Sequence, residues 1–344
     1  MRIALLTGGG DVPGLNAAIR AVARRAFDFG WEVYGIYEGW RGLRDGIIGP
    51  LDRPDVSGIL HRGGTILGSS RTNLAQNKED MDQAISVSKE FGLDAIIAIG
   101  GEDTLSVCAQ LTKRGLPAVG IPKTIDNDVH GTDYCIGFNT AVTTVADALD
   151  KLHTTAESHH RVIVVEVMGR YTGWVAVLGG LAGGADYIAI PEKPSSISDI
   201  CKHLARRWEM GKKFSIVVVA EAASIAEIHA TDEEAAEHKD QFGHIRLDLR
   251  GLGSTLAKAI QQRTGFETRF VVLGHVQRGG SPTVFDRVLA TRMGVCAVDL
   301  IKEGKYACMV ALRGNRIVNV PLEQIAHRRR EVDPELVELA QLFY

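Results

Sequence analysis

IALLTGGGDVPGLNAAIRAVARRAFDFGWEVYGIY, from Ile3 to Tyr37, has the pattern of a strand, a helix and a second strand. Its two ends, IALLTG and EVYGIY, are short apolar runs that are typical of strands. Between them, Leu15 to Phe29 carries apolar residues at helical spacing. The residues on that face are Ala18, Ile19, Val22, Ala23 and Ala26. The chain therefore opens with a βαβ unit, which predicts parallel strands.

The same alternation continues along the rest of the chain. Further apolar runs are AIIAIG, PAVGIP, VIVVEVMG, YIAIP, FSIVVVAE and FVVLGHV, and a long helix is expected from about 140 to 155. Such uninterrupted apolar strands are typical of parallel sheets that helices cover on both faces. We expect an α/β fold with two doubly wound, mostly parallel-sheet lobes. One lobe is predicted to contain residues 1–138 and about 278–303, and the other 139–277 and about 304–344.

The bulk composition indicates a globular protein. The 344 residues are 45% hydrophobic and 24% charged, and no segment approaches the roughly 18 unbroken apolar residues of a membrane span. The opening MRIALLTGGG lacks the features of a signal peptide, and the five cysteines are scattered without a CxxC pair. We therefore expect a soluble, cytoplasmic protein. Its net charge of -3 predicts no general affinity for nucleic acid or an anionic membrane.

Two polar segments are interpreted as solvated surface. Ser224 to Leu249 is rich in charge and loses apolar periodicity, which favours a surface insertion over a partner-binding element. The basic run from His327 to Arg330 is interpreted in the same way.

The first glycine turn suits an anionic ligand. Ligands of open parallel sheets bind beyond the carboxyl ends of strands, and Gly8 to Gly10 lie between the first strand and a helix expected to begin near Pro13 or Gly14. Glycine lets backbone amides approach a phosphate, and a helix N-terminus adds a favourable field. Because tight βα turns also use glycine for their geometry, this turn alone leaves both roles open.

The second turn, GGEDT, places the carboxylates Glu102 and Asp103 directly after Gly100 and Gly101. An acidic side chain beside such a turn can hold Mg²⁺, and the ion bridges to phosphate oxygens. Glu102 suits that role.

The third turn, PKTIDND, follows an apolar strand with a dense group of polar side chains. Asp126 and Asp128 lie two residues apart, with Lys123 and Thr124 just before them. They can be simple turn formers. Their density at a strand end favours function, in which one carboxylate accepts a proton from an attacking hydroxyl and the other positions metal or substrate.

The fourth group is basic and borders the later strands. It consists of Arg161, Arg170, Arg269, His275 and Arg278. A single arginine is usually surface decoration, but several at strand ends suit phosphate oxygens. A metal carboxylate, a base carboxylate and these cations together predict transfer of a phosphoryl group onto a phosphorylated hydroxyl compound.

The chain resembles the 6-phosphofructokinases. GGGDVPGLNAAIR, RGGTILGSSR, GGEDT, PKTIDND, GTDYCIGFNTA, VVEVMGRYTG and LGHVQRGGSP match the blocks of that family in order and span Gly8 to about Asp299. The resemblance implies a donor and catalytic lobe, a sugar-phosphate lobe, and a glycolytic or gluconeogenic reaction on fructose 6-phosphate.

The resemblance also implies roles for single residues. Asp126 is the general base for the sugar 1-hydroxyl, with Asp128 and Thr124 beside it, and Glu102 is the acid associated with Mg²⁺. Arg71 and Arg170 stabilise the transferred phosphoryl, which passes Gly10 and Gly101. The residues implied to bind the sugar phosphate are Arg161, Met168, Gly169, Arg170, Glu221, Arg269, His275 and Arg278.

Two positions indicate the phosphoryl donor. ATP-using members typically have glycine where this chain has Asp103 and Lys123, and the pyrophosphate-dependent branch carries the Asp/Lys pair. A carboxylate about 4 Å from a nucleotide's α-phosphate costs about 4 kcal/mol at an effective dielectric of about 20. Lys123 can hold the terminal oxygens of a short donor. We therefore expect pyrophosphate as the donor and a reversible reaction.

Three other functions fit part of the pattern. An ATP-dependent 6-phosphofructokinase is the nearest, because some members with the lysine still use ATP when the first position is glycine. NAD kinases share the GG-acid-x-T turn but not the later blocks. A sugar-phosphate sensor would have lost the base, and Asp126 is present.

The resemblance implies a homodimer or homotetramer with shared active sites, because Arg161 and Arg269 act across an interface in the family. An effector nucleotide site is less favoured. Arg20, Arg24 and Arg53 occupy its positions, but His153 and Asp186 replace the partners expected there.

Overall fold

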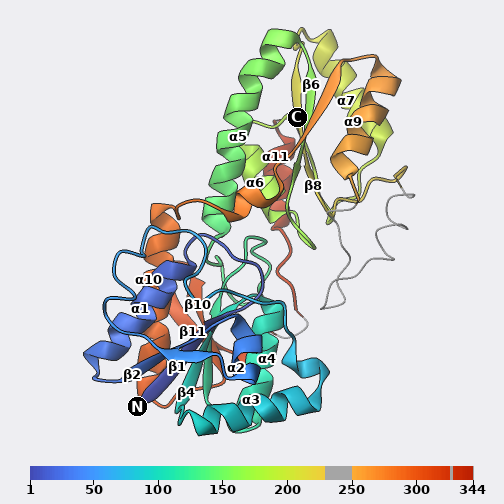
Figure 1. Cartoon of the computed structure of the whole chain (residues 1–344). Coiled ribbons are helices and arrows are strands. Elements are labelled where there is room, and N and C mark those ends of the chain that lie inside the picture. The colour runs from blue at the N-terminus through green and yellow to red at the C-terminus, as the bar shows by residue number, and fades with distance from the viewer. Residues whose placement is uncertain (229–249, 326–327, 344) are drawn as a thin grey trace. The chain divides into compact units, whose positions relative to one another are not determined.

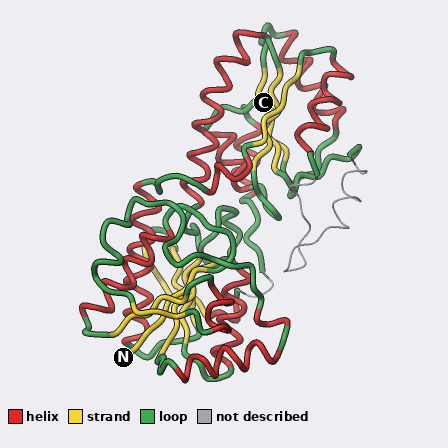
Figure 2. The backbone as a smooth tube through the Cα atoms, viewed as in Figure 1, coloured by secondary structure: helices red, strands yellow, loops and turns green. Residues whose placement is uncertain are grey.

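The computed structural model describes residues 1–228, 250–325 and 328–343, and the chain divides into two compact units (Figure 1). Unit 1 consists of Met1–Thr140 and Arg278–Arg330, and unit 2 of Ala141–Gln277 and Glu331–Tyr344. Each unit has a mostly parallel sheet with helices around it (Figure 2). The expected α/β fold is confirmed. Of the expected insertion, residues 229–249 lie outside the described part of the chain.

The sheet of unit 1 has seven strands in the order β11-β10-β5-β4-β1-β2-β3. Their bounds are β1 Arg2–Thr7, β2 Glu32–Ile36, β3 Ile48–Pro50, β4 Ala95–Gly100, β5 Ala118–Pro122, β10 Cys308–Arg313 and β11 Arg316–Pro321. The pairs β2/β3 and β10/β11 at the two edges are antiparallel, and all other neighbours are parallel.

The connections of unit 1 create a switch point between β1 and β4. From β1 the chain crosses to β2 on one side, and from β4 it crosses to β5 on the other. Because such crossovers are right-handed, their helices cover opposite faces of the sheet. The loops after β1 and β4 are therefore left free to diverge at the carboxyl edge, where ligands of such sheets bind.

The helices of unit 1 form two layers. They are α1 Leu15–Asp28, α2 Gly39–Asp45, α3 Lys78–Glu90, α4 Glu102–Lys113 and α10 Val284–Lys302, with short 3-10 turns at Leu74–Gln76 and Leu322–Gln324. Figure 1 shows α1 and α10 side by side on one face of the sheet, with α2, α3 and α4 on the other.

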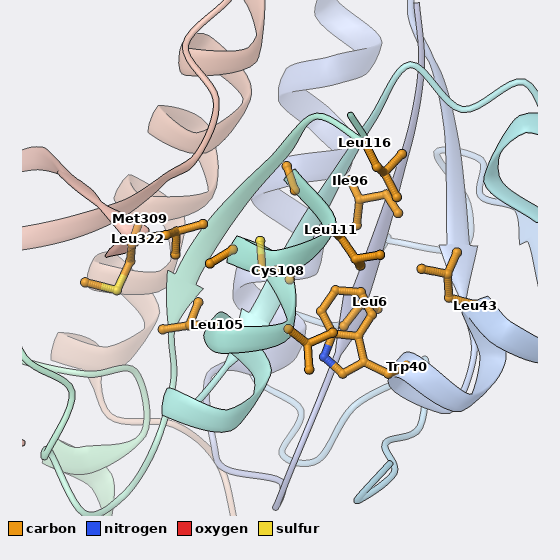
Figure 3. Close-up of a cluster of buried hydrophobic side chains, with 14 of the residues drawn as sticks. Leu6, Trp40, Leu43, Ile96, Leu105, Cys108, Leu111, Leu116, Met309 and Leu322 are labelled. Atoms are coloured by element: carbon orange, nitrogen blue, oxygen red, sulfur yellow. The ribbon is translucent and has the colours of Figure 1, made fainter. Parts of the chain in front are cut away.

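Apolar side chains join the sheet of unit 1 to this second layer. Leu6 from β1 and Ile96 from β4 lie in one buried cluster with Trp40 from α2 and Leu111 from α4 (Figure 3). Met309 from β10 belongs to the same cluster. Fully burying one such side chain contributes about 1.5–3 kcal/mol to the stability of the fold. This core therefore holds α4 firmly against the sheet.

The sheet of unit 2 has four parallel strands in the order β7-β8-β6-β9. They are β6 Val162–Val167, β7 Tyr187–Ala189, β8 Ser215–Ala220 and β9 Thr268–Val272. The helices among its described residues are α6 Trp174–Ala182, α7 Ile197–Glu209, α9 Leu252–Thr264 and α11 Pro334–Gln341, and a 3-10 turn spans Gly274–Arg278. Helix α5, Phe138–His159, runs from unit 1 into unit 2. None of the described helices has the length and apolarity needed to cross a membrane.

Residues 304–330 were expected in the second lobe but belong to unit 1. The reason is strand pairing, because β10 hydrogen-bonds to β5 and carries β11 with it. Both strands therefore belong to the sheet of unit 1, and the chain enters unit 2 again only at Glu331.

A buried carboxylate anchors the start of α5 within unit 1. Asp286 is fully buried and accepts hydrogen bonds from the amides of Gly137 and Thr140 at 3.0 and 2.8 Å. It also accepts one from the Thr140 hydroxyl. Burial raises the pKa of Asp286, and the three donors oppose that rise. The carboxylate therefore satisfies helix-end amides that would otherwise be left without partners.

Replacing Asp286 by asparagine should lower the stability of the protein. The amide nitrogen of asparagine would meet a donor where the carboxylate now accepts, and an unsatisfied buried group costs about 1–3 kcal/mol. We expect a clear fall in the urea midpoint of Asp286→Asn. Asp299→Asn, on the same helix at a half-exposed ion pair with Arg25, should shift the midpoint far less. Equal shifts in the two variants would contradict the assignment.

Candidate functional site

The glycine loop after β1 lies against the start of α4. The Gly8 amide donates to the carbonyl of Ile99 at the end of β4, at 3.0 Å. A Cβ at Gly8 would lie 2.6 Å from Oγ1 of Thr104. Thr104 is buried on the first turn of α4. The first glycine is therefore required for close packing of the loop on α4.

The next two glycines line a pocket of about 430 Å³ in unit 1 together with Arg71. The Gly9 amide donates to Ser70 at 3.1 Å, and the φ angle of 76° at Gly9 lies in the left-handed region that favours glycine. The pocket thus joins two of the expected donor-side groups, Gly10 and Arg71, on one hollow surface.

Lys123, the residue after β5, braces this glycine loop. Its Nζ donates to the carbonyls of Gly8 at 2.8 Å and Gly10 at 2.6 Å, and the residue is only 3% exposed. Burial, with a smaller contribution from the positive charge of Arg278, lowers the pKa of Lys123 to about 7. The ammonium lies at the expected donor loop, but in this structure its partners are backbone carbonyls.

Arg278 lies beside the same loop. Its Nη1 donates to the carbonyl of Asp11 at 3.3 Å, and a Cβ added to Gly10 would come within 2.6 Å of that nitrogen. The family resemblance implied that Arg278 binds the sugar phosphate, a role that stays a prediction. Within unit 1 it stands at the glycine loop, so its guanidinium adds positive charge next to Gly10.

Glu102 and Asp103 form the first turn of α4. The N-cap, Gly101, offers no side-chain hydrogen bond to the helix. Carboxylates are stabilised at a helix N-terminus because the unpaired amides there carry partial positive charge. Both side chains are partly exposed. Two acids therefore stand where a phosphate could otherwise bind the helix end.

The aspartates after β5 lie on a turn shaped by Asn127. Asn127 has φ 53°, and its side chain accepts from the Cys135 amide at 2.8 Å and donates to the Asp133 carbonyl at 3.2 Å. Asparagine tolerates this left-handed conformation better than most residues. The Asp126 amide also donates to Oγ1 of Thr124 at 3.1 Å. These contacts fix the backbone on both sides of Asp126.

Asp128 shares its surroundings with two other carboxylates. Burial is the main cause that raises the pKa of Asp128, and the negative charges of Asp126 and Glu102 raise it further. Arg329 opposes the shift. The expected base and the expected metal ligand are thus brought together within unit 1.

The structure adds Arg329 to this group. Its Nε lies 3.7 Å from Oε2 of Glu102, and its backbone pairs antiparallel with Val129. From sequence, the basic run that includes Arg329 was expected to be solvated surface. No local pattern indicates the contact, because it depends on a pairing between residues about 200 positions apart in the chain.

In unit 2, the residues expected at the sugar gather beyond the carboxyl end of β6. The Gly169 amide donates to Oε1 of Glu221 at 3.3 Å, and the Met168 amide donates to Oε1 of Gln277 at 3.3 Å. Gly169 has φ 151°, and a Cβ there would approach the Thr172 carbonyl to 2.7 Å. Gln277 was not among the residues expected at the site, although it lies in the GHVQRGG block.

Arg170 and His275 each come shortly after a strand of the unit 2 sheet. Arg170 follows Gly169 after β6, and His275 belongs to the 3-10 turn that follows β9. Because β6 and β9 are parallel, both residues come after carboxyl ends of neighbouring strands.

Arg161 and Arg269 lie at the opposite end of that sheet. Arg161 precedes β6, Arg269 pairs with Ile163 near the start of β9, and both contact Glu267 at 2.8 and 2.6 Å. A six-residue strand separates the two ends by about 17 Å. The structure therefore groups these two arginines with each other and not with Met168 and Glu221.

Comparison with known proteins gives concordant matches. The model of the family described as phosphofructokinase matches residues 2–301. A pyrophosphate–fructose 6-phosphate 1-phosphotransferase of Amycolatopsis methanolica is 51% identical over 100% of both chains. ATP-dependent 6-phosphofructokinase 3 of Streptomyces coelicolor is 50% identical over 94% of each chain. The T-state crystal structure of Pichia pastoris phosphofructokinase has a TM-score of 0.81 at 36% identity, covering 94% of this chain and 35% of that one.

The Lys123 ammonium should titrate near neutral pH. In protein labelled with ¹³C at lysine Cε, we expect one signal to shift with a midpoint near pH 7, because burial lowers the pKa of Lys123 to about 7. Lys123 is therefore positive below that pH and neutral above it. An ordinary lysine titrates at about 10.4. The signal should be absent in Lys123→Met, and a bound anion should move its midpoint to higher pH. Titration of every lysine near pH 10 would contradict the result.

Proposed function

Because the chain belongs to the phosphofructokinase family, we propose that it transfers a phosphoryl group reversibly from pyrophosphate to the 1-hydroxyl of fructose 6-phosphate. The products are fructose 1,6-bisphosphate and phosphate. The observation that carries the choice of donor is Asp103, a carboxylate on the first turn of α4 beside the glycine loop.

Overall similarity does not select the donor. Relatives named for pyrophosphate and for ATP are 51% and 50% identical to this chain. The choice therefore depends on the residues at the donor site. An ATP-dependent 6-phosphofructokinase is the second candidate function. The 50% identity to the Streptomyces coelicolor enzyme of that name favours it.

Asp103 disfavours a donor with a third phosphate. Two like charges about 4 Å apart repel by about 1 kcal/mol in water and about 4 kcal/mol at an effective dielectric of about 20. Because Asp103 is partly exposed, the penalty lies between these limits. That corresponds to a loss of about fivefold to a thousandfold in affinity for a nucleotide. Pyrophosphate has no α-phosphate to be repelled.

The cations at the glycine loop support a short anionic donor. Lys123 and Arg278 both lie against Gly10, and Arg71 lines the same pocket. A phosphate at this loop would compete with the Gly8 and Gly10 carbonyls for the Lys123 ammonium. Hydrogen bonds from the ammonium to either partner are charge-assisted, but a phosphate also carries a formal negative charge. Its Coulomb attraction to the ammonium favours that exchange.

Glu102 fits a role in binding Mg²⁺. Among the residues described, no set of three or more His, Cys, Asp or Glu side chains is arranged to hold a metal. Mg²⁺ commonly takes only one or two carboxylates and completes its shell with water and substrate phosphates. Glu102 and the nearby Asp126–Asp128 turn can provide one or two such carboxylates. When bound, the ion would neutralise charge on the phosphoryl oxygens.

The protein's own residues divide the remaining chemistry. Asp126 accepts the proton of the sugar 1-hydroxyl as that oxygen attacks phosphorus and the bond to the leaving phosphate breaks. Asn127 and Thr124 hold the Asp126 backbone in place. Arg71 and Arg170 stabilise charge on the transferred group, while Met168, Gly169 and Glu221 position the sugar.

We propose in addition that active sites are shared between subunits of a homo-oligomer. Arg161 and Arg269 lie at the far end of the unit 2 sheet from Met168 and Glu221. The edge strand β9 carries Arg269, and on the same strand Phe270 and Val272 are 48% and 51% exposed. An exposed apolar edge strand favours association, which would let both arginines reach the sugar phosphate of a neighbour.

Donor choice tests the proposed function. Purified protein with fructose 6-phosphate and Mg²⁺ should turn over with pyrophosphate at a kcat/KM well above that with ATP, and it should catalyse the reverse reaction with phosphate. Asp103→Gly should raise kcat/KM for ATP by at least about fivefold, the lower bound of the charge penalty.

Asp103→Glu is the matched control, because it keeps the charge at the same helix position and should still disfavour ATP. Efficient ATP use by the unmodified protein without pyrophosphate activity would refute the assignment. No change in ATP use by Asp103→Gly would refute its electrostatic cause.

Subunit mixing tests the shared site. Asp126→Ser and Arg161→Ala should each be nearly inactive, the first with sugar-phosphate binding retained. When equal amounts are unfolded and refolded together, half of the dimers are hybrids with one intact site each, so about a quarter of full activity should return. Mixtures as inactive as the separate variants would show that each site is built from one chain.

A further inference from the structure

The C-terminal end of unit 1 brings a cation to the carboxylate group of the candidate site. Arg330 donates its amide to the carbonyl of Asp128 at 2.9 Å, and Arg329 pairs its backbone with Val129. This strand-like contact lays the segment 328–330 along the turn that carries the aspartates. None of the roles proposed above uses Arg329.

The side chain of Arg329 is directed at Glu102. Nε and Oε2 are 3.7 Å apart, and the two side chains are 41% and 27% exposed. Asp126 and Glu102 act on Asp128 as like charges, while Arg329 is the cation that opposes them. Three carboxylates in one small region repel each other, so a guanidinium beside them reduces that repulsion.

We propose that Arg329 is a positioning residue that acts through Glu102. Its guanidinium holds the Glu102 carboxylate in the orientation used during phosphoryl transfer and limits the negative charge that a divalent cation meets there. The inference rests on the proposed function for its kinetic part only. Its metal-binding part concerns this chain's carboxylates and holds for any divalent cation.

A purely structural role for the segment makes a different prediction. The backbone contacts of residues 329 and 330 need no guanidinium, so they persist when the side chain changes. Arg328 is exposed on the same segment, and neighbouring residues of an extended chain point to opposite sides. Arg328→Gln is therefore a matched control for the loss of one positive charge.

The experiment compares Arg329→Gln, Arg329→Lys and Arg328→Gln. Binding of Mn²⁺ alone is measured by electron paramagnetic resonance, and turnover is measured with pyrophosphate, fructose 6-phosphate and Mg²⁺. Arg329→Gln should bind Mn²⁺ at least about threefold more tightly, since one cation beside a carboxylate has been removed. Its kcat should fall at least about tenfold, with a smaller change in KM for fructose 6-phosphate.

Arg329→Lys should recover much of the turnover because it keeps the charge, and Arg328→Gln should match the unmodified protein. In a Glu102→Gln background the effect of Arg329→Gln on Mn²⁺ should vanish, because the double-mutant cycle removes their coupling. Unchanged Mn²⁺ binding by Arg329→Gln would overturn the proposal. The proposal would also be overturned if Arg329→Gln and Arg329→Lys lost turnover to the same extent and lost thermal stability to the same extent. If the protein lacks phosphofructokinase activity altogether, the proposed function fails while the Mn²⁺ result still tests the pairing.

Discussion

The hydrogen bonds from the buried Lys123 ammonium to the glycine loop are the contact on which the proposed donor side of the site depends. Lys123 follows β5, the carbonyls of Gly8 and Gly10 follow β1, and β4 lies between those strands. Two strand spacings are about 10 Å, which a long flexible side chain and a curled glycine loop can span together. Since a buried charge is costly without partners, the ammonium gives the loop one preferred shape. That shape places Gly10 next to Arg278 and the 430 Å³ pocket.

Opposite charges alternate around this contact. Beside the positive loop, Glu102 and Asp103 place negative charge at the N-terminus of α4, and the Asp126–Asp128 turn adds more. Arg329 adds a cation beside Glu102. Under the proposed function, a short anion at the loop meets mainly cations, whereas the α-phosphate of a nucleotide is repelled by Asp103. Specificity of this kind arises from repulsion of the wrong ligand as much as from attraction of the right one.

Much of this arrangement follows from local sequence. Continuous apolar strands and an opening βαβ unit predicted the α/β fold, and the rule that ligands bind at carboxyl ends directed attention to the turns at Gly8, Glu102 and Asp126. The predicted lobe of β10 and β11 was wrong because strand order depends on pairing between distant segments, and the periodicity of the local sequence does not encode that pairing. Arg329 was missed for the same reason. Asn127 lies in the PKTIDND turn, but its bracing role depends on contacts with Asp133 and Cys135, which the local sequence does not indicate.

The central claim is that the negative charge at position 103 disfavours a nucleotide and spares pyrophosphate. Its most direct measurement is calorimetric binding, in the presence of Mg²⁺, of methylenediphosphonate and of a non-hydrolysable ATP analogue to the unmodified protein and to Asp103→Asn, which keeps the shape of the side chain. We predict that the substitution tightens binding of the ATP analogue at least about fivefold and changes binding of methylenediphosphonate by much less. Equal changes for the two ligands, or no change for either, would contradict the account.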